Sequence, residues 1–237
     1  MTGQTAFALT LTVASACLIN WGYLREHAAT SLLSPLSLRR PLASVRLLLG
    51  SRGWLVGFAA ESFGFGLFVG AVALAPLALV QAVAAGGVGV LALLVARTTG
   101  SRLERRERLG VGVAIGGLVL LAVSLAGGSE AGGAGDWPAI AMWLGASVGA
   151  AVAAAVWGAK VIGGGAAFGV SAGILFGAGD VATKVLVGGG DHLVVAPAMI
   201  AFYTAGTVVL QLGFQRGAAL TIAGIATLGT NAIPIAA

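Results

Sequence analysis

The chain has 237 residues, of which 58% are hydrophobic and 9% are charged, and its mean hydropathy is +1.01. A soluble domain carries about 25% charged residues, because it needs them to cover its surface. The composition therefore excludes an ordinary soluble enzyme, and a disordered chain would need low hydrophobicity and high charge. Cys17 is the single cysteine, which excludes a disulfide scaffold. A polytopic membrane protein is the class that remains.

Eight segments of the chain are long and apolar enough to cross a membrane. A helix that spans a hydrocarbon core of about 30 Å needs roughly 20 apolar residues. These segments are apolar on every face, whereas barrel strands alternate over about ten residues. The sequence therefore predicts an all-α polytopic membrane protein with spans at 6–24, 54–75, 76–96, 110–126, 138–158, 166–187, 193–214 and 218–237.

The basic residues indicate how these spans are oriented. Ten of the thirteen basic residues lie in two connecting segments, 25–53 and 97–109. Cytoplasmic loops are enriched in Lys and Arg, so both segments are placed inside and the N-terminus outside. No nucleic-acid partner is expected, because no folded surface remains to present these charges. Segment 25–53 is either an amphipathic helix on the inner surface or a vestigial span. The bias toward Ala, Gly and Arg suggests a bacterial plasma membrane.

Glycines recur at a spacing that favours close helix packing. Small residues four apart let two helix backbones approach in lipid. This spacing occurs at Gly66/Gly70, Gly112/Gly116 and Gly145/Gly149, and in a triple step at Gly169/Gly173/Gly177. We expect the triple step to form an interface stripe on the span at 166–187. A homodimer is left open.

Weak self-similarity predicts two inverted repeats. Segments 70–86 and 213–229 share four residues at a constant offset: Gly70/Gly213, Ala75/Ala218, Leu77/Leu220 and Gly86/Gly229. Spans one to three then match spans six to eight, and a displacement of five spans gives the copies opposite orientation. Residues 1–126 form the first repeat, and 127–237 form a linker and an incomplete second repeat. We expect the chain to lack the counterpart of 95–126.

Several segments resemble the EamA-like drug/metabolite transporter superfamily, although each motif is rich in alanine and glycine. The segments that carry the resemblance are 71–81, 105–110, 116–121, 176–184, 214–220 and 231–234. The resemblance implies two inverted five-helix repeats. This chain has one span fewer in the first half, and in that respect and in its outside N-terminus it is similar to the nine-span NIPA-type magnesium transporters. Those proteins carry an acidic residue in the helix before the Ala-Pro motif. Glu61 lies in that helix, about one turn further from Pro76 than expected.

Charged groups inside spans are candidate functional residues, because each costs at least about 2.5–3.5 kcal/mol on insertion scales. Glu61 is either a ligand for a cation (including a metal), a protonatable carrier group, or a side chain that reaches the inner interface near Trp54. Asp180 and Lys184 are four residues apart and can neutralise each other. Alternatively, Lys184 meets a substrate anion or a proton-coupling partner. Uncharged polar side chains that either line a cavity or join helices include Gln81, Tyr203, Gln211 and Asn231.

Three functions are compatible with these features, and none of them is enzymatic. The chain has no Walker loop or metal-ligand cluster, so no cofactor is expected. The first function is a secondary transporter that moves a small solute by rocking of the repeats. The second is a magnesium or other divalent-cation transporter that uses Glu61, with Asp180 as a further oxygen ligand. The third is a membrane scaffold or fragment that transports nothing.

Overall fold

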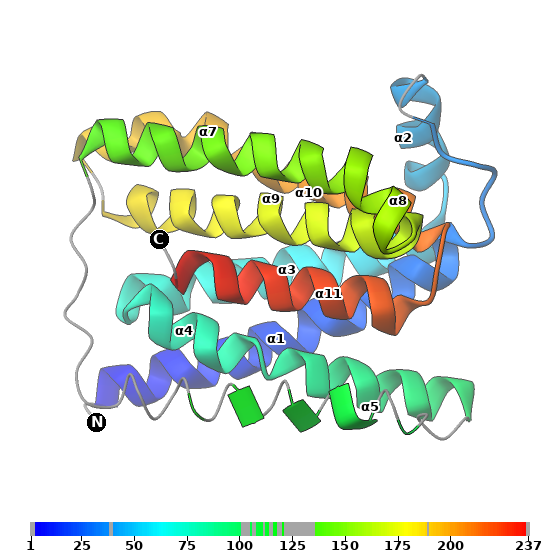
Figure 1. Cartoon of the computed structure of the whole chain (residues 1–237). Helices are drawn as coiled ribbons and strands as arrows, with labels where there is room; N and C mark the ends of the chain where they lie inside the picture. Colours follow the sequence, from blue (N-terminus) through cyan, green and yellow to red (C-terminus); the bar gives the residue numbers. More distant parts are fainter. Residues whose placement is uncertain are drawn as a thin grey trace.

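The computed structural model is an α-helical bundle (Figure 1). It describes residues 3–37, 40–100, 105, 108–110, 112–113, 116–117, 120, 136–188 and 190–235. The first half contains α1 (Gly3–Thr30), α2 (Pro41–Leu49), α3 (Arg52–Leu74), α4 (Leu77–Ala84) and α5 (Gly87–Thr99). The second half contains α7 (Trp137–Ala153), a π-helical turn (Ala154–Gly158), α8 (Ala159–Val161), α9 (Gly164–Val187), a 3-10 helix (Gly190–Val195), α10 (Ala196–Phe214), α11 (Ala219–Ala232) and a final 3-10 turn (Ile233–Ile235).

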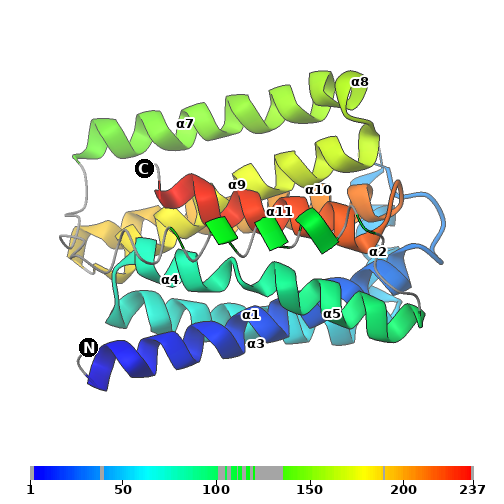
Figure 2. The same ribbon diagram turned by 60° about the horizontal axis from the view of Figure 1, so that its bottom comes forward.

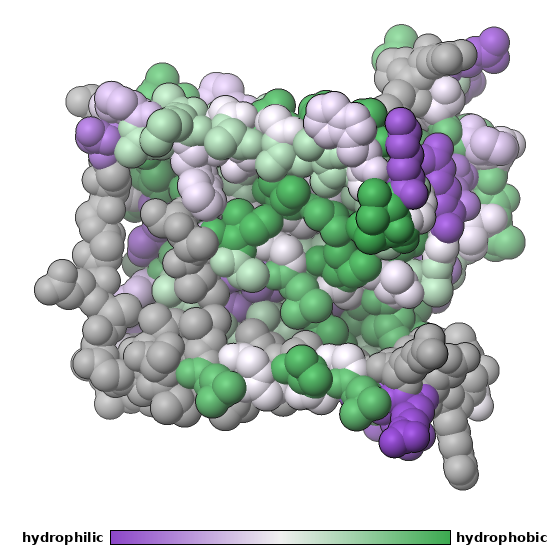
Figure 3. All heavy atoms as spheres, in the orientation of Figure 1, coloured by the Kyte–Doolittle hydropathy of each residue, from purple (hydrophilic) through white to green (hydrophobic). Residues whose placement is uncertain are grey.

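Six helices in the described ranges are long and apolar enough to cross a membrane. They lie at Gly3–Thr30, Arg52–Leu74, Leu77–Thr98, Trp137–Val161, Gly164–Val187 and Leu193–Phe214. Ala219–Ala232 is a shorter apolar helix within the predicted span 218–237, and the predicted span 110–126 lies largely outside the described residues. The chain is therefore an all-α, multi-pass membrane protein. Apolar side chains spread over the face between the two ends of the bundle (Figure 3).

The first connecting segment differs from the prediction. The sequence ended the first span at residue 24, but α1 continues to Thr30. Within segment 25–53 the nine-residue helix α2 forms, which agrees with the helix alternative and is too short for a span. Helix α1 can continue because both charged residues near its end, Arg25 and Glu26, have favourable surroundings. Arg25 stacks over the ring of Trp21 at 5.6 Å, whereas Glu26 is fully buried. Helix α3 then begins after Ser51, whose Oγ accepts a hydrogen bond from the backbone N–H of Trp54 at 3.3 Å.

The predicted span at 76–96 consists of two helices. Ala75 is extended before Pro76, because the proline ring disfavours a helical conformation in the residue that precedes it. Helix α4 then starts at Leu77 and ends at Ala84, and α5 starts at Gly87. Ala85 and Gly86 form a turn with helical φ and ψ angles between the two helices, and Leu77–Thr98 as a whole is long and apolar enough to cross a membrane.

Helix α1 packs along α3, while α9 packs against α7, α10 and α11 (Figures 1 and 2). A Cβ atom added at Gly22 of α1 would lie 2.8 Å from the carbonyl oxygen of Gly57 in α3. A Cβ added at Gly173 of α9 would lie 2.8 Å from the carbonyl oxygen of Ala226 in α11. At both crossings the backbones are in contact, which only glycine allows.

The glycine spacing identifies one interface correctly. Gly169 and Gly173 lie against α11, and Gly177 lies against Ile233, as the triple step predicts. By contrast, a Cβ added at Gly66, Gly145 or Gly149 would meet no described heavy atom within 4 Å. A side chain at those positions would therefore not be excluded by a neighbouring helix in the described part of the chain.

The spans differ in how much of their surface is covered. In the most apolar 18-residue stretch of each span, 67% of residues are buried in α9, against 17% in Trp137–Val161 and 22% in Leu193–Phe214. Helix α9 is therefore the central helix of the second half. The helix before it and the helix after it face outward over most of their length.

Basic side chains gather at one end of the bundle. The end of α1, the start of α3, helix α8 and the α10–α11 turn lie together there (Figure 1). The basic residues of these segments are Arg25, Arg52, Lys160 and Arg216. The opposite end holds Asp136 and the turn that contains Pro76. Placing the basic end inside a cell stays a prediction.

Candidate ligand cavity

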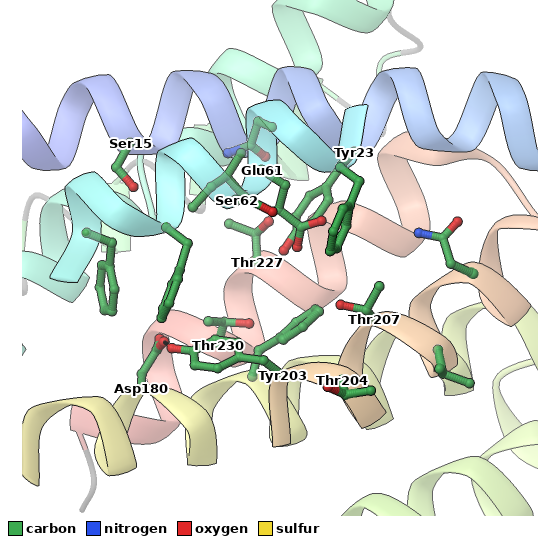
Figure 4. Close-up of a pocket in the computed structure, with 18 of the residues that line it drawn as sticks. Ser15, Tyr23, Glu61, Ser62, Asp180, Tyr203, Thr204, Thr207, Thr227 and Thr230 are labelled. Atoms are coloured by element: carbon green, nitrogen blue, oxygen red, sulfur yellow. Dashed lines mark hydrogen bonds between the residues drawn. The ribbon is translucent and has the colours of Figure 1, made fainter. Parts of the chain in front are cut away.

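A cavity of about 420 Å³ lies inside the bundle, between α1 and α3 on one side and α9, α10 and α11 on the other (Figure 4). Its volume falls within the range of ligand pockets, about 300–1,000 Å³. Seven aromatic side chains line it: Tyr23, Trp54, Phe58, Phe65, Phe68, Phe176 and Tyr203. Two carboxyl groups, those of Glu61 and Asp180, belong to opposite walls.

The structure brings six of the seven predicted site residues to this one cavity. They come from α3, α4, α9, α10 and α11, and are Glu61, Gln81, Asp180, Tyr203, Gln211 and Asn231. Gln81, Asp180, Gln211 and Asn231 are at most 5% exposed. Lys184 is not among the lining residues. That these side chains bind a ligand stays a prediction.

Asp180 is the centre of a hydrogen-bond network on α9. Gln81 Nε2 donates to Asp180 Oδ2 at 2.6 Å, and the Tyr203 hydroxyl donates to Asp180 Oδ1. The Tyr203 hydroxyl also lies 3.2 Å from Thr183 Oγ1. Gly179 makes room for this ring, because a Cβ there would lie 3.0 Å from its carbons. The network joins α4, α9 and α10 through a single carboxylate.

The expected pairing of Asp180 with Lys184 is wrong. Lys184 Nζ donates to the carbonyl oxygens of Val72 at 3.0 Å and Ala75 at 3.4 Å, at the end of α3. An ammonium group stabilises the negative end of a helix dipole and satisfies carbonyls that have no partner within the helix. Lys184 therefore caps α3, while Asp180 faces the cavity and accepts hydrogen bonds from neutral donors.

Glu26, which the sequence places in a connecting segment, lies with Glu61 at the crossing of α1 and α3. A Cβ added at Gly57 would lie 2.8 Å from Glu26 Cγ, and one added at Gly22 would lie 3.3 Å from Glu61 Cβ. Glu26 Oε1 and Glu61 Oε2 are buried and accept no hydrogen bond from a described residue. Gln211 Nε2 donates to Glu26 Oε2, and Thr30 Oγ1 donates to Gln211 Oε1 at 2.7 Å. Glu26 and Thr30 are both fully buried. One feature of the sequence could have identified Glu26 as a buried residue. Tyr23 lies three residues before it and Thr30 four residues after it, so all three share one face of α1.

Helices α4 and α5 border the cavity wall. Gly87, at the start of α5, packs on the side-chain amide of Asn20 in α1. Asn20 Nδ2 donates to the carbonyl oxygen of Ala16 at 2.8 Å, while its Oδ1 receives no hydrogen bond from a described residue. Gln81 Oε1, on α4, likewise receives none. Side chains of the cavity wall therefore hold buried acceptors for which the described protein supplies no donor.

The lining of the cavity is negative and oxygen-rich. It contains no Lys, Arg or His among the described residues, and the half-buried Lys184 is turned to the end of α3. No group of three or more His, Cys, Asp or Glu side chains in the described ranges is arranged to hold a metal ion. The arrangement suits a neutral or cationic ligand and disfavours an anion.

No protein-family model, curated protein or solved structure matches the chain. The resemblance to EamA-like and NIPA-type transporters therefore stays a prediction from the sequence.

Proposed function

We propose that the protein is a secondary transporter that carries a small, neutral or cationic organic solute across a cell membrane by alternating access. The observation that carries this proposal is the cavity of about 420 Å³ inside the bundle, with walls from both halves of the chain. Aromatic rings offer apolar contact, and the carboxyl and amide groups offer hydrogen-bond acceptors, which is the usual composition of a ligand pocket.

Buried hydrogen-bond acceptors on the cavity wall give further support. Asn20 Oδ1 and Gln81 Oε1 belong to lining residues and receive no hydrogen bond from a described residue. Buried polar groups are normally hydrogen-bonded, so a ligand that carries donors would satisfy these two atoms.

Alternating access predicts that one cavity residue is reached from both sides of the membrane. We expect Thr207→Cys, introduced together with Cys17→Ala, to react with a membrane-impermeant maleimide in right-side-out and in inside-out vesicles. Thr207 lines the cavity on α10, and removal of Cys17 leaves the new thiol as the only one. The experiment needs no knowledge of the solute.

The matched control is Val152→Cys in the same background. Val152 is 57% exposed on the outward face of α7, where a thiol in hydrocarbon does not form the reactive thiolate. We expect no labelling of this variant from either side. Labelling of Thr207→Cys from one side only, or from neither, would contradict a carrier.

A second candidate function is transport of a divalent cation such as magnesium. The observation in its favour is the approach of the Glu26 and Glu61 carboxyl groups, since carboxylate oxygens are the ligands that hard cations prefer. This function ranks second because the described residues offer no third acidic ligand at that place.

Magnesium binding predicts thermal stabilisation that depends on Glu61. A ligand that binds only the folded state adds about 2.7 kcal/mol at a concentration of 100 times its Kd. If the cation function is right, magnesium raises the Tm of the purified protein in detergent, and Glu61→Gln abolishes the rise. Asp136→Asn, which alters an exposed carboxylate at the start of α7, keeps it. An unchanged Tm in the wild type rejects this function.

A further inference from the structure

We propose that Glu26 and Glu61 form a proton-binding site that holds one proton between their two carboxyl groups. The inference rests on the proposed function for its purpose, because such a site would supply the coupling ion of the carrier. Its geometry rests on α1 and α3 alone. The two helices cross at Gly22 and Gly57, where their backbones are in contact, and this crossing brings the side chains of Glu26 and Glu61 together.

Two buried carboxyl groups at one helix crossing, each with an oxygen that accepts no hydrogen bond from a described residue, favour a proton between them. Ionised carboxylates only accept hydrogen bonds, so a hydrogen bond between two of them exists only when one carries a hydrogen. Like charges at this separation in a buried site do not both ionise. Glu26 is fully buried, and no described Lys or Arg side chain lies against either group to offset a second negative charge.

The surroundings distinguish the two carboxyl groups. Glu26 lies behind the wall, and its Oε2 is held by Gln211 Nε2, which fixes its orientation. Glu61 lines the cavity. A cationic solute in the cavity offsets a second negative charge, so its arrival favours release of the proton to water, and its departure favours return of the proton. The charge of the cavity wall therefore changes by one unit with each proton.

Other titratable groups near the pair do not supply a counter-charge. Tyr23 on α1 faces both carboxyl groups, and Asp180 and Tyr203 face them across the cavity from α9 and α10. His27 follows Glu26 on α1, but its Nε2 lies 3.0 Å from the carbonyl oxygen of Gly217, outside the cavity lining. Lys184 is bonded to the end of α3.

Infrared spectroscopy of the full-length protein in liposomes tests the site. We expect the Asp180→Asn protein, which lacks the other buried carboxyl group of the cavity, to show at neutral pH the C=O absorption of one protonated carboxyl group. Glu26→Gln and Glu61→Gln should each abolish this absorption completely. In either variant the new amide can donate to the remaining carboxylate, which then ionises. In the same background Asp136→Asn, at the exposed start of α7, is the control and should keep the absorption.

The outcomes separate the shared proton from an ordinary buried acid. Absorption that is lost in only one of the two glutamine variants would assign the proton to that residue alone and overturn the proposal. Absence of the absorption in Asp180→Asn would also overturn it. If circular dichroism shows that a glutamine variant is unfolded, the test is a pH titration of Asp180→Asn, followed by the same infrared absorption. Conversion of one protonated carboxyl to carboxylate supports the site, and conversion of two or none overturns it.

These results do not depend on transport. If the infrared test fails, two-sided labelling of Thr207→Cys still supports the carrier function. If labelling occurs from one side only, the infrared absorption still reports whether the two glutamates share a proton. Failure of the proton site and failure of the carrier function are therefore distinguishable.

Discussion

Replacement of Gly173 by valine is expected to lower the stability of the purified protein by about 3 kcal/mol, the upper range for overpacking a well-packed contact. A Cβ at this position would lie 2.8 Å from the carbonyl oxygen of Ala226 and 3.1 Å from the Cα of Gly229. Both atoms belong to the backbone of α11, so relief requires that α9 and α11 separate along the crossing. The Tm in detergent, followed by circular dichroism, is the measurement.

The matched control for Gly173→Val is Gly66→Val on α3. Gly66 lies on an exposed helix face, and a Cβ there would meet no described heavy atom within 4 Å. Both substitutions exchange a helical glycine for the same β-branched residue, so the loss of helix propensity is shared. Only the helix contact differs. Equal losses of stability in the two variants would show that α9 and α11 do not touch at Gly173.

Replacement of Gln211 by leucine is expected to cost about 2 kcal/mol of stability, because it leaves two buried polar groups without partners. Gln211 donates to Glu26 and accepts from Thr30, and all three side chains are at most 1% exposed. Leucine has a similar volume and no polar atoms, so packing is kept while the hydrogen bonds are lost. The Tm measures the effect, and Gln4→Leu, at an exposed position of α1, should change stability by less than about 0.5 kcal/mol.

The double variant Gln211→Leu, Glu26→Leu tests the cause of that loss. Replacing both partners of a buried hydrogen bond by apolar groups of similar shape can be nearly neutral. We therefore expect Glu26→Leu to restore most of the stability that Gln211→Leu removes. A further drop in the double variant would place the cost in packing and not in the unsatisfied carboxyl group.

The class of fold could be predicted from the sequence because composition and the length of apolar segments decide it. Seven of the eight predicted spans overlap apolar helices of the structure, and the eighth lies largely outside the described residues. The boundaries were less predictable. Residues 25–27 carry two charged groups and a histidine, which suggests a loop, and only the tertiary packing of Glu26 against Gln211 keeps that turn of α1 inside the bundle.

The site could be predicted in part, for a related reason. Polar residues in apolar spans had to face other helices, and six of the seven that were singled out line one cavity. Their partners could not be inferred. The i, i+4 spacing of Asp180 and Lys184 predicted a pair, but the break at Pro76 supplies carbonyl groups that Lys184 binds instead. Sequence spacing shows which side chains can meet within a helix and says nothing about competing groups on the next helix.

The unequal burial of the spans has a consequence for how the chain enters the bilayer during synthesis. Helix α9 carries Asp180 and Lys184, and each charged group at the centre of a span opposes insertion by about 2.5–3.5 kcal/mol. The preceding span, Trp137–Val161, contains one charged residue, Lys160, near its end, and it leaves the ribosome before α9 does. It can therefore settle in lipid first and offer α9 a protein surface, and α10 follows to cover Asp180 with Tyr203. On this order of events, the outward-facing helices on either side of α9 act as its partners during biogenesis.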